Sequence, residues 1–242
     1  MNELLLIGSL VVLYGAVLLW FCLFGTGGLM AFTVFATIAA NIEVMILLDA
    51  FGMEMTLGNI LFATTFLVTD ILSEVAGKKE AQKAVWAGIA ANVLFIIVSQ
   101  SWLLYVPSAN DWVRPAMEAV FSNTPRMMLS SLAVYVVAQN FDVWLYHKWW
   151  TLTENRTGDH RAFLWLRNNG STLVSQLLNT VLFTLFAFYG IYDWGTLLSV
   201  ALSSYVIFIF TSLLDTPVVY AARWLHERKG AAGSCCREKE SK

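Results

Sequence analysis

The chain has 242 residues, of which 58% are hydrophobic and 13% are charged, and its mean hydropathy is +0.64. Soluble domains carry about 25% charged residues, so this chain has too few polar side chains to cover a water-facing surface. Disorder requires low hydrophobicity and high net charge, whereas the net charge here is −2. A pI near 5.9 leaves no basic footprint for nucleic acid. The composition predicts an all-α integral membrane protein that has the lipid bilayer as its partner and no nucleic acid.

Long apolar runs predict a bundle of seven transmembrane helices, because each membrane helix needs about 20 apolar residues. The runs are residues 4–24, 29–50, 57–76, 83–105, 126–147, 171–190 and 195–220. They are continuously apolar and do not alternate, which argues against a transmembrane β-barrel. Residues 169–172, Asn-Gly-Ser-Thr, are typical of a turn followed by a helix cap. The sixth helix is therefore expected to begin after this turn.

The positive charges predict the orientation in the membrane. Of the 15 Lys and Arg residues, 13 follow the third, fifth and seventh runs, and the other two are Arg114 and Arg126. Cytoplasmic loops are enriched in Lys and Arg, so we expect a cytoplasmic C-terminus and, with seven spans, an external N-terminus. The first run lacks the basic segment and cleavage site of a signal peptide. It is expected to remain as a helix.

Motifs of enzymes and metal sites are absent from the sequence. No Walker A loop, H-E-x-x-H motif or G-x-S-x-G motif is present. The seventh run has no lysine for a retinal Schiff base. Cys22, Cys235 and Cys236 lack the spacing of a metal site, and the last two are expected to be plain cytosolic thiols. We expect no enzymatic activity, no metal and no cofactor.

Polar residues inside the predicted spans are the candidate functional residues, because an ionisable group in a bilayer is costly. They are Asn41, Glu43, Asp70, Glu74, Gln139, Asp142, Gln176, Asn179 and Asp215. Residues three or four apart share a helix face, which places Asp70 with Glu74 and Gln139 with Asp142. With the predicted orientation, all of them except Asn41 and Glu43 lie in the inner half of the bilayer.

A purely structural role stays open for three of these carboxylates, each of which has a candidate partner. The pairs are Glu74 with Lys78, Asp142 with Lys148 or Arg167, and Asp215 with the backbone groups freed by Pro217. Asp70 and Glu43 have no such simple explanation. They are the strongest candidates for a functional role.

Five segments in order along residues 38–224 resemble the YhhQ-like family of vitamin-uptake and queuosine-precursor transporters. The stretch FATTFLVTDILSEVAGKKEAQKAVWAG, residues 62–88, is similar to the family signature T-D-x-x-x-E-x-x-G-K-x-x-A. The other similar segments are residues 41–52, 138–150, 164–183 and 213–224. One departure concerns Asn179, which stands where the family pattern often has Asp. The loss of a charge there weakens the case for proton coupling at that position.

The resemblance implies a multi-pass transporter of the cytoplasmic (inner) membrane. Its substrates would be nucleobase-like queuosine precursors for tRNA modification: 7-cyano-7-deazaguanine, 7-aminomethyl-7-deazaguanine or queuine. It also implies a six-helix core over residues 29–224, similar to the substrate-binding subunits of energy-coupling-factor transporters. Residues 1–28 would be an extra helix and residues 225–242 a cytoplasmic polar tail. Self-association into a homodimer stays open.

The resemblance also implies which residues bind the substrate. They are Asp70, Glu74, Gln139, Asp142, Arg167, Ser171, Gln176, Asn179 and Asp215, to which the residues near mid-membrane add Asn41 and Glu43. A carboxylate accepts the paired N–H donors of a deazaguanine, and amides complete its acceptor side. We expect alternating access with secondary transport, coupled to protons through Asp70 or Glu43. The alternative is a substrate-capturing subunit that needs a partner ATPase.

Overall fold

The computed structural model describes residues 1–121, 125–158, 163–190 and 192–240, and the side chains of residues 125–127, 157 and 229–240 are outside this description. The predicted all-helical class is confirmed, with one small hairpin as an addition. The elements are α1 (Asn2–Glu43), β1 (Leu47–Ala50), β2 (Met53–Thr56), α2 (Gly58–Ala76), α3 (Lys78–Trp102), α4 (Arg114–Phe121), α5 (Pro125–Thr157), α6 (Leu164–Phe188) and α7 (Trp194–Glu240). Cys235 and Cys236 lie among the side chains that are not described.

Six helices in the described part of the chain are long and apolar enough to cross a membrane: α1, α2, α3, α5, α6 and α7. The seven predicted runs map onto these six because α1, with 42 residues, takes in the first two. This helix is broken at Gly25, whose φ of 63° and ψ of −144° are non-helical and are readily adopted by glycine.

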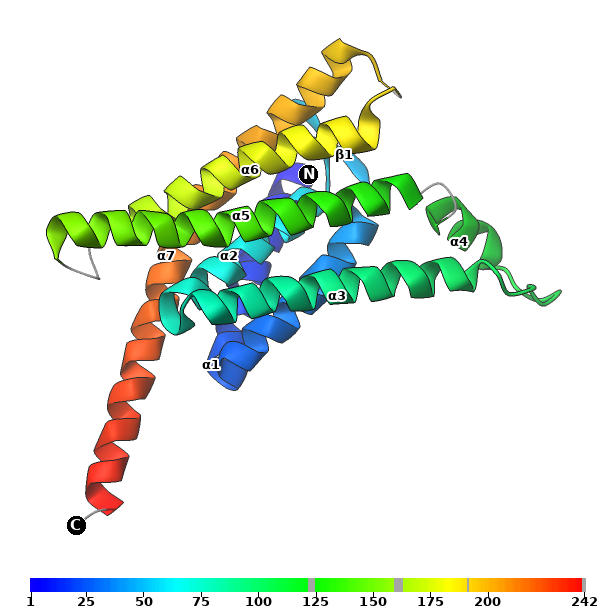
Figure 1. Ribbon diagram of the computed structural model, residues 1–242. Coiled ribbons are helices and arrows are strands. Elements are labelled where there is room, and N and C mark those ends of the chain that lie inside the picture. The colour runs from blue at the N-terminus through cyan, green and yellow to red at the C-terminus, as the bar shows by residue number, and fades with distance from the viewer. Residues whose placement is uncertain (122–124, 159–162, 191, 241–242) are drawn as a thin grey trace.

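The break at Gly25 folds α1 back on itself. The rings of Trp20 and Phe32 are 5.7 Å apart, although twelve residues of straight helix rise about 18 Å. Figure 1 shows the two blue halves of α1 running in opposite directions. The reversal lies three residues before the predicted boundary at residue 28. The division of the chain into extra helix, core and tail stays a prediction.

A β-hairpin replaces the end of the second predicted run. The helix ends at Glu43, and residues 47–50 pair with residues 53–56 in an antiparallel register that sets Ala50 opposite Met53. Phe51 and Gly52 form the two-residue loop with φ values of 53° and 73°, as in the type I′ turns that match the twist of a hairpin. The sequence does not predict this turn, because phenylalanine is not a residue that favours a positive φ.

The predicted turn over residues 169–172 is wrong, since α6 begins at Leu164 and runs straight through these residues. Gly170 serves close packing instead. A Cβ atom at this position would lie 3.3 Å from Nε1 of Trp149 on α5. The glycine therefore lets α5 and α6 approach each other, which is a common use of small residues in membrane helices.

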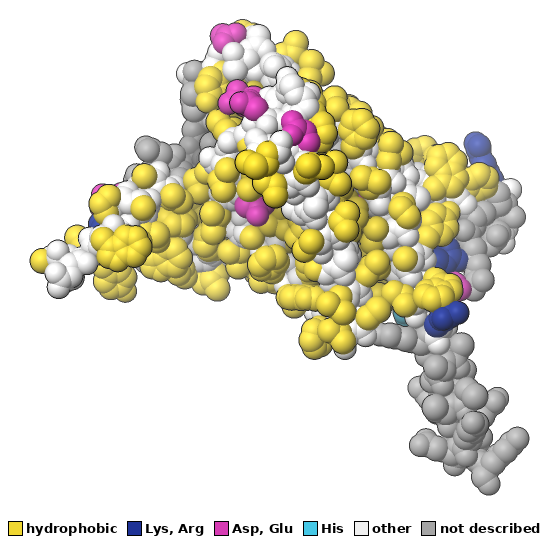
Figure 2. Space-filling model, turned by 180° about the vertical axis from the view of Figure 1, so that it is seen from behind, with side chains coloured by type: hydrophobic (Ala, Val, Ile, Leu, Met, Phe, Trp, Pro, Cys, Tyr) yellow, Lys and Arg dark blue, Asp and Glu magenta, His cyan; other side chains and the backbone are white. Residues whose placement is uncertain are grey.

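The two ends of the bundle differ in charge. We call the end that carries Lys78, Lys148 and Arg223 the basic end, and the end that carries β1 and β2 the hairpin end. Figure 2 shows dark blue side chains mostly at one end, magenta side chains toward the other, and hydrophobic side chains between them. Helix α2 contacts α1, α3, α5 and α7 and is the most buried of the six long helices. Polar residues on α2 therefore lie inside the protein.

Candidate functional site

Three aspartates from three helices meet inside the bundle. Asp70 of α2, Asp142 of α5 and Asp215 of α7 are each no more than 1% exposed. Asp70 and Asp142 are close enough to interact electrostatically, and Asp215 interacts with both. We call these three residues the carboxyl layer. The structure thus brings together side chains that are up to 145 residues apart in the sequence.

Most oxygens of the carboxyl layer have no hydrogen-bond partner within the described part of the chain. The hydroxyl of Thr172 donates to Oδ2 of Asp70 at 2.9 Å. Oδ1 of Asp70 and both oxygens of Asp142 and of Asp215 are buried and accept no hydrogen bond from the described residues. Buried polar groups in proteins are nearly always hydrogen-bonded. The hydroxyls of Ser171 and Ser175 lie beside Asp142, and that of Tyr14 lies beside Asp215. The oxygens therefore form a buried set of acceptors with room for further donors from a ligand.

Helix α6 adds hydroxyl and amide groups beside the carboxyl layer. Ser171 and Ser175 lie next to Asp142, and both hydroxyls donate to backbone carbonyls one turn earlier in their own helix, at 2.8 Å. Asn179 donates to Oε1 of Gln176 at 3.4 Å. The Nε2 atom of Gln176 is buried and, among the described residues, donates to nothing. This N–H group is therefore an unused donor on the same helix as Ser171 and Ser175.

Gln139 is held in place by two threonines of α2. Its Nε2 donates to Oγ1 of Thr65 at 2.7 Å, and its Oε1 accepts from Oγ1 of Thr69 at 3.3 Å. Asp142 lies one turn further along the same helix. Gln139 therefore fixes α5 against α2 beside the carboxyl layer.

A second cluster closes the bundle at its basic end. Glu74 accepts from Nη2 of Arg167 at 2.7 Å on both oxygens, from Nη1 of Arg223 at 2.9 Å, and from the hydroxyl of Tyr146 at 2.9 Å. The side chains of Glu74 and Arg167 are 3% and 1% exposed. We call these four residues the ion cluster. It links α2, α5, α6 and α7 around one buried carboxylate.

An aromatic residue supports the ion cluster. The guanidinium carbon of Arg167 lies 4.3 Å from the ring centre of Trp150, a cation–π contact. His147 stacks on the same indole with an interplanar angle of 4°. Trp150, His147 and Glu74 also line a cleft at the basic end. The ion cluster therefore lies between this cleft and the carboxyl layer.

The two sets of residues are stacked along the same helices. Glu74 follows Asp70 by four residues on α2, and Tyr146 follows Asp142 by four on α5. Four residues of helix rise about 6 Å. The carboxyl layer and the ion cluster are therefore about one helical turn apart.

The structure decides between the partners that the sequence left open. Glu74 pairs with Arg167 and Arg223 rather than with Lys78. Asp142 forms no ion pair in the described part of the chain, because Arg167 is held by Glu74 and the Lys148 ammonium lies 4.7 Å from the ring of Trp144.

The prediction that Asp215 binds the backbone groups freed by Pro217 is also wrong. Neither of its oxygens forms a hydrogen bond with the described residues, so it does not satisfy backbone groups freed by Pro217. The hydroxyl of Tyr14 lies beside it but donates to the carbonyl of Thr211 at 3.3 Å.

The two predicted residues of α1 lie apart from the carboxyl layer. Asn41 donates to Oδ1 of Asn92 on α3 at 3.0 Å, which is a helix-to-helix contact. Glu43 is half-buried at the last residue of α1 and forms no side-chain hydrogen bond or ion pair with the described residues. The structure gives neither residue a contact with Asp70, Asp142 or Asp215.

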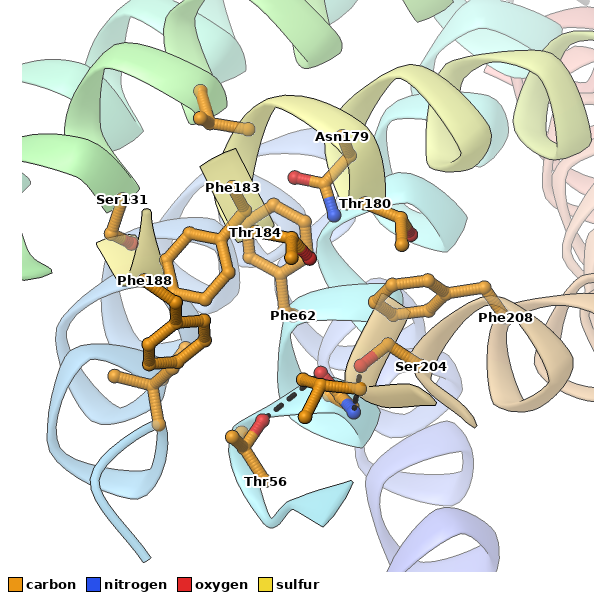
Figure 3. Close-up of a pocket in the computed structure, with 16 residues that line it drawn as sticks. Thr56, Phe62, Ser131, Asn179, Thr180, Phe183, Thr184, Phe188, Ser204 and Phe208 are labelled. Carbon is orange, nitrogen blue, oxygen red and sulfur yellow. Dashed lines mark hydrogen bonds between the residues drawn. The ribbon is translucent and has the colours of Figure 1, made fainter. Parts of the chain in front are cut away.

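A cavity opens toward the hairpin end. The empty space between its lining residues is about 590 Å³, counting space open to solvent. Phe62, Phe183, Phe188 and Phe208 line it together with hydroxyl and amide side chains, as Figure 3 shows. We call it the aromatic cavity. Asn179, which bonds to Gln176, connects it to the polar groups of α6.

Several residues of this region were missed from the sequence. They are Tyr14, Tyr146, Trp150, Thr172 and Arg223. Tyr146 carried a usable signal, since it lies four residues after Asp142 and shares its helix face. Arg223 was counted only as a charge of the cytoplasmic tail, because it ends an apolar segment. In the described part of the chain, no three His, Cys, Asp or Glu residues are arranged to hold a metal ion.

Comparison with known proteins places the chain in a family. Residues 56–222 match the model of the family described as "Putative vitamin uptake transporter". The chain belongs to this family. The chain is also 40% identical over 207 residues to the "Probable queuosine precursor transporter" of Bacillus subtilis (strain 168), a match that covers 86% of this chain and 88% of that protein. No solved structure matches it significantly. The protein is therefore a membrane transporter. The carboxyl layer lies within the matched residues, as do the ion cluster except Arg223 and the lining of the aromatic cavity except Ala40 and Val44.

Proposed function

We propose that the protein imports a queuosine precursor of the 7-deazaguanine class across the cytoplasmic membrane, for salvage into tRNA. The observation that carries this proposal is the carboxyl layer, in which five buried carboxylate oxygens lack hydrogen bonds to the described residues. A buried acceptor set of this kind is costly unless a ligand or a proton completes it. The name of the Bacillus subtilis relative supports the substrate class.

The chemistry of the layer suits a deazaguanine. The pyrimidine edge of such a base carries adjacent N–H donors and one carbonyl acceptor. Asp142 or Asp215, with both oxygens free, accepts two neighbouring donors at once. The free Nε2 of Gln176 supplies a donor for the carbonyl. One oxygen of Asp70 is already held by the hydroxyl of Thr172.

The positions of the cavity and the ion cluster support transport by alternating access. The aromatic cavity opens at the hairpin end, and the ion cluster closes the basic end. With Lys and Arg facing the cytoplasm, this conformation faces outward. Release of the substrate to the cytoplasm then requires Glu74 to separate from Arg167 and Arg223. This separation would connect the carboxyl layer to the cleft beside Trp150.

Proton coupling is the energy source that we favour. Three carboxyl groups that interact inside the bilayer repel one another when ionised, and no Lys or Arg in the described part of the chain pairs with them. A proton that binds together with the substrate relieves this repulsion. Asp70 is the favoured site for the proton, because it interacts with both Asp142 and Asp215. An uncoupler is expected to abolish uptake, and uptake that persists without a proton gradient would contradict the coupling.

The alternative is a substrate-capturing subunit that needs a partner ATPase. Liposomes that contain only this chain distinguish the two. Uptake driven by an imposed proton gradient supports a secondary transporter. Uptake only after a partner ATPase is added supports the alternative.

The test of the function is salvage. The protein is expressed in bacteria that can neither make deazaguanines nor import them, each precursor is supplied at low concentration, and queuosine in tRNA is measured. Asp70→Asn and Gln139→Ala are expected to lower salvage without lowering membrane expression. Asp49→Asn, at an exposed residue of β1, is the matched control. No queuosine from any precursor would reject the function, and wild-type salvage by both variants would reject the site.

A further inference from the structure

The aromatic cavity has a flat apolar middle between two polar ends. The rings of Phe62 and Phe208 are 6.5 Å apart, and those of Phe183 and Phe188 are 5.7 Å apart. In Figure 3, Phe183 and Phe188 lie on one side of the space and Phe208 on the other. At these distances the two rings of each pair contact each other, so the two pairs form apolar walls of the cavity against which a planar ring can pack.

One polar end of the cavity is built by β2, α2 and α7. Oγ1 of Thr56 donates to Oδ1 of Asn59 at 3.1 Å, and Nδ2 of Asn59 donates to Oγ of Ser204 at 3.3 Å. This leaves a second amide hydrogen on Asn59 and the hydroxyl hydrogen of Ser204 available. Both groups line the cavity and can donate to a ring carbonyl or nitrogen of a ligand.

The opposite polar end is built by α6. Thr180 is 4% exposed, and its hydroxyl forms no hydrogen bond with the described residues. Figure 3 shows Asn179 and Thr180 together at the end of the cavity away from Thr56 and Ser204. The cavity therefore offers hydrogen bonds at both edges of a flat molecule.

None of the sixteen described residues that line the cavity is charged. Glu43 is adjacent in sequence to the lining residue Val44 but is not part of the lining. A cation that enters this space loses water and gains no carboxylate partner. The phenyl rings attract a cation more weakly than the lost water did.

We infer that the aromatic cavity is a first binding subsite for an uncharged planar heteroaromatic base, separate from the carboxyl layer. The inference rests on the proposed function and deepens it, because it names the neutral form of the precursor as the preferred substrate. Phe62 lies eight residues from Asp70 on α2, and Phe208 lies seven from Asp215 on α7. The subsite is therefore about two helical turns, or roughly 11 Å, from the carboxyl layer. A base leaves it past Asn179 and Gln176.

Binding to the purified full-length protein tests the subsite. Calorimetry compares guanine and 7-cyano-7-deazaguanine, which are uncharged, with cationic 7-aminomethyl-7-deazaguanine. The uncharged bases are expected to bind at least about tenfold more tightly. Phe183→Leu and Phe208→Leu keep the apolar volume and remove the ring, and each is expected to weaken binding by about three- to tenfold. Phe210→Leu is the matched control, because Phe210 is 63% exposed and lines a different groove.

A charge placed in the cavity gives an independent test of selectivity. Asn59→Asp keeps the shape and the hydrogen bond accepted from Thr56, and it reverses the bond with Ser204, whose hydroxyl then donates. This variant is expected to bring the ratio of the affinities for uncharged and cationic bases close to one. Equal binding of cationic and uncharged bases by the wild type would overturn the inference. So would unchanged binding in both leucine variants, or no binding of any uncharged base.

The outcomes separate this inference from the proposed function. Binding of guanine but of neither deazaguanine would reject the proposed function and retain the subsite. Salvage in cells, combined with equal affinity for charged and uncharged bases, would retain the function and reject the subsite.

Discussion

Glu74 of α2 and Arg167 of α6 form a buried bidentate ion pair across the basic end of the bundle. Nη2 of Arg167 is 2.7 Å from each carboxylate oxygen, and Nε is 3.1 Å from Oε2. The two residues are 93 positions apart in the sequence. Because a buried charge is tolerated only when it is paired, this contact fixes how α2 and α6 pack.

Removal of the Glu74 charge is therefore expected to destabilise the protein strongly. Glu74→Gln leaves Arg167 and Arg223 without their shared carboxylate, and loss of one partner of a buried pair costs about 3–5 kcal/mol. Thermal unfolding in detergent measures the effect. Glu80→Gln is the matched control, because its pair with Lys83 is much more exposed and is worth about 0–1 kcal/mol. Equal shifts in Tm for the two variants would contradict the assigned role of Glu74.

Gly88 of α3 is expected to be intolerant of a side chain. A Cβ atom there would meet the hydroxyl of Tyr135 on α5 and would lie 3.1 Å from Oγ1 of Thr37 on α1. Overpacking of this kind costs about 1–3 kcal/mol, so Gly88→Ala should lower Tm in detergent. The double variant with Tyr135→Phe should recover part of the loss, because the clashing oxygen is gone.

The control for Gly88 is Gly15→Ala in α1. No atom of the described residues lies within 4 Å of a Cβ placed at Gly15, and alanine is favoured over glycine in a helix by about 0.5–1 kcal/mol. This variant is expected to be as stable as the wild type or more stable. A loss of Tm similar to that of Gly88→Ala would show that helix packing is not the cause.

Thr172 is expected to be a positioning residue for the substrate. Its hydroxyl makes the hydrogen bond to Asp70 at 2.9 Å, and hydrogen bonds to charged groups contribute about 1.5–3 kcal/mol. Thr172→Val removes this bond with little change of shape and should lower the initial rate of uptake by about tenfold or more. Thr172→Ser keeps the hydroxyl and should behave like the wild type. Equal uptake by the two variants would rule out this role.

Chemical labelling is expected to confirm the orientation of the chain. In a variant with Cys22, Cys235 and Cys236 replaced by alanine, a cysteine is introduced at Ser108 or at Lys79, both of which are exposed. An impermeant maleimide applied to intact cells should label Ser108→Cys, between α3 and α4, and should not label Lys79→Cys at the basic end. The reverse pattern would show that the positive-inside rule fails for this protein.

The candidate site was predictable where its signal is local. Asp70 and Glu74, or Gln139 and Asp142, share a helix face because of their spacing alone. The structure places all four inside the bundle with Asp215, as expected from the cost of a charge in lipid. The partner of Glu74 was not predictable in this way. Local spacing favoured Lys78, whereas packing brings Arg167 and Arg223 from other helices.

Two local signals were misleading because tertiary packing overrode them. Residues 169–172 have the composition of a turn, but Gly170 gives α6 room to pack on Trp149. Residues 47–50 continue an apolar run, but they form a strand because Phe51 and Gly52 turn the chain back. In both cases the deciding contact lies outside the residues that carry the pattern.

The amino-acid sequence by itself determines that this is a helical membrane protein with a minority of buried acidic residues. The reason is that lipid offers no hydrogen bonds, so every apolar run of sufficient length must satisfy its own backbone as a helix. Only the tertiary structure decides that α1 folds back at Gly25, that four phenylalanines enclose a cavity, and that Asp70, Asp142 and Asp215 meet. These features depend on the rotation and crossing of each helix. In lipid, where one apolar face is as good as another, close packing and buried polar contacts between helices set that arrangement.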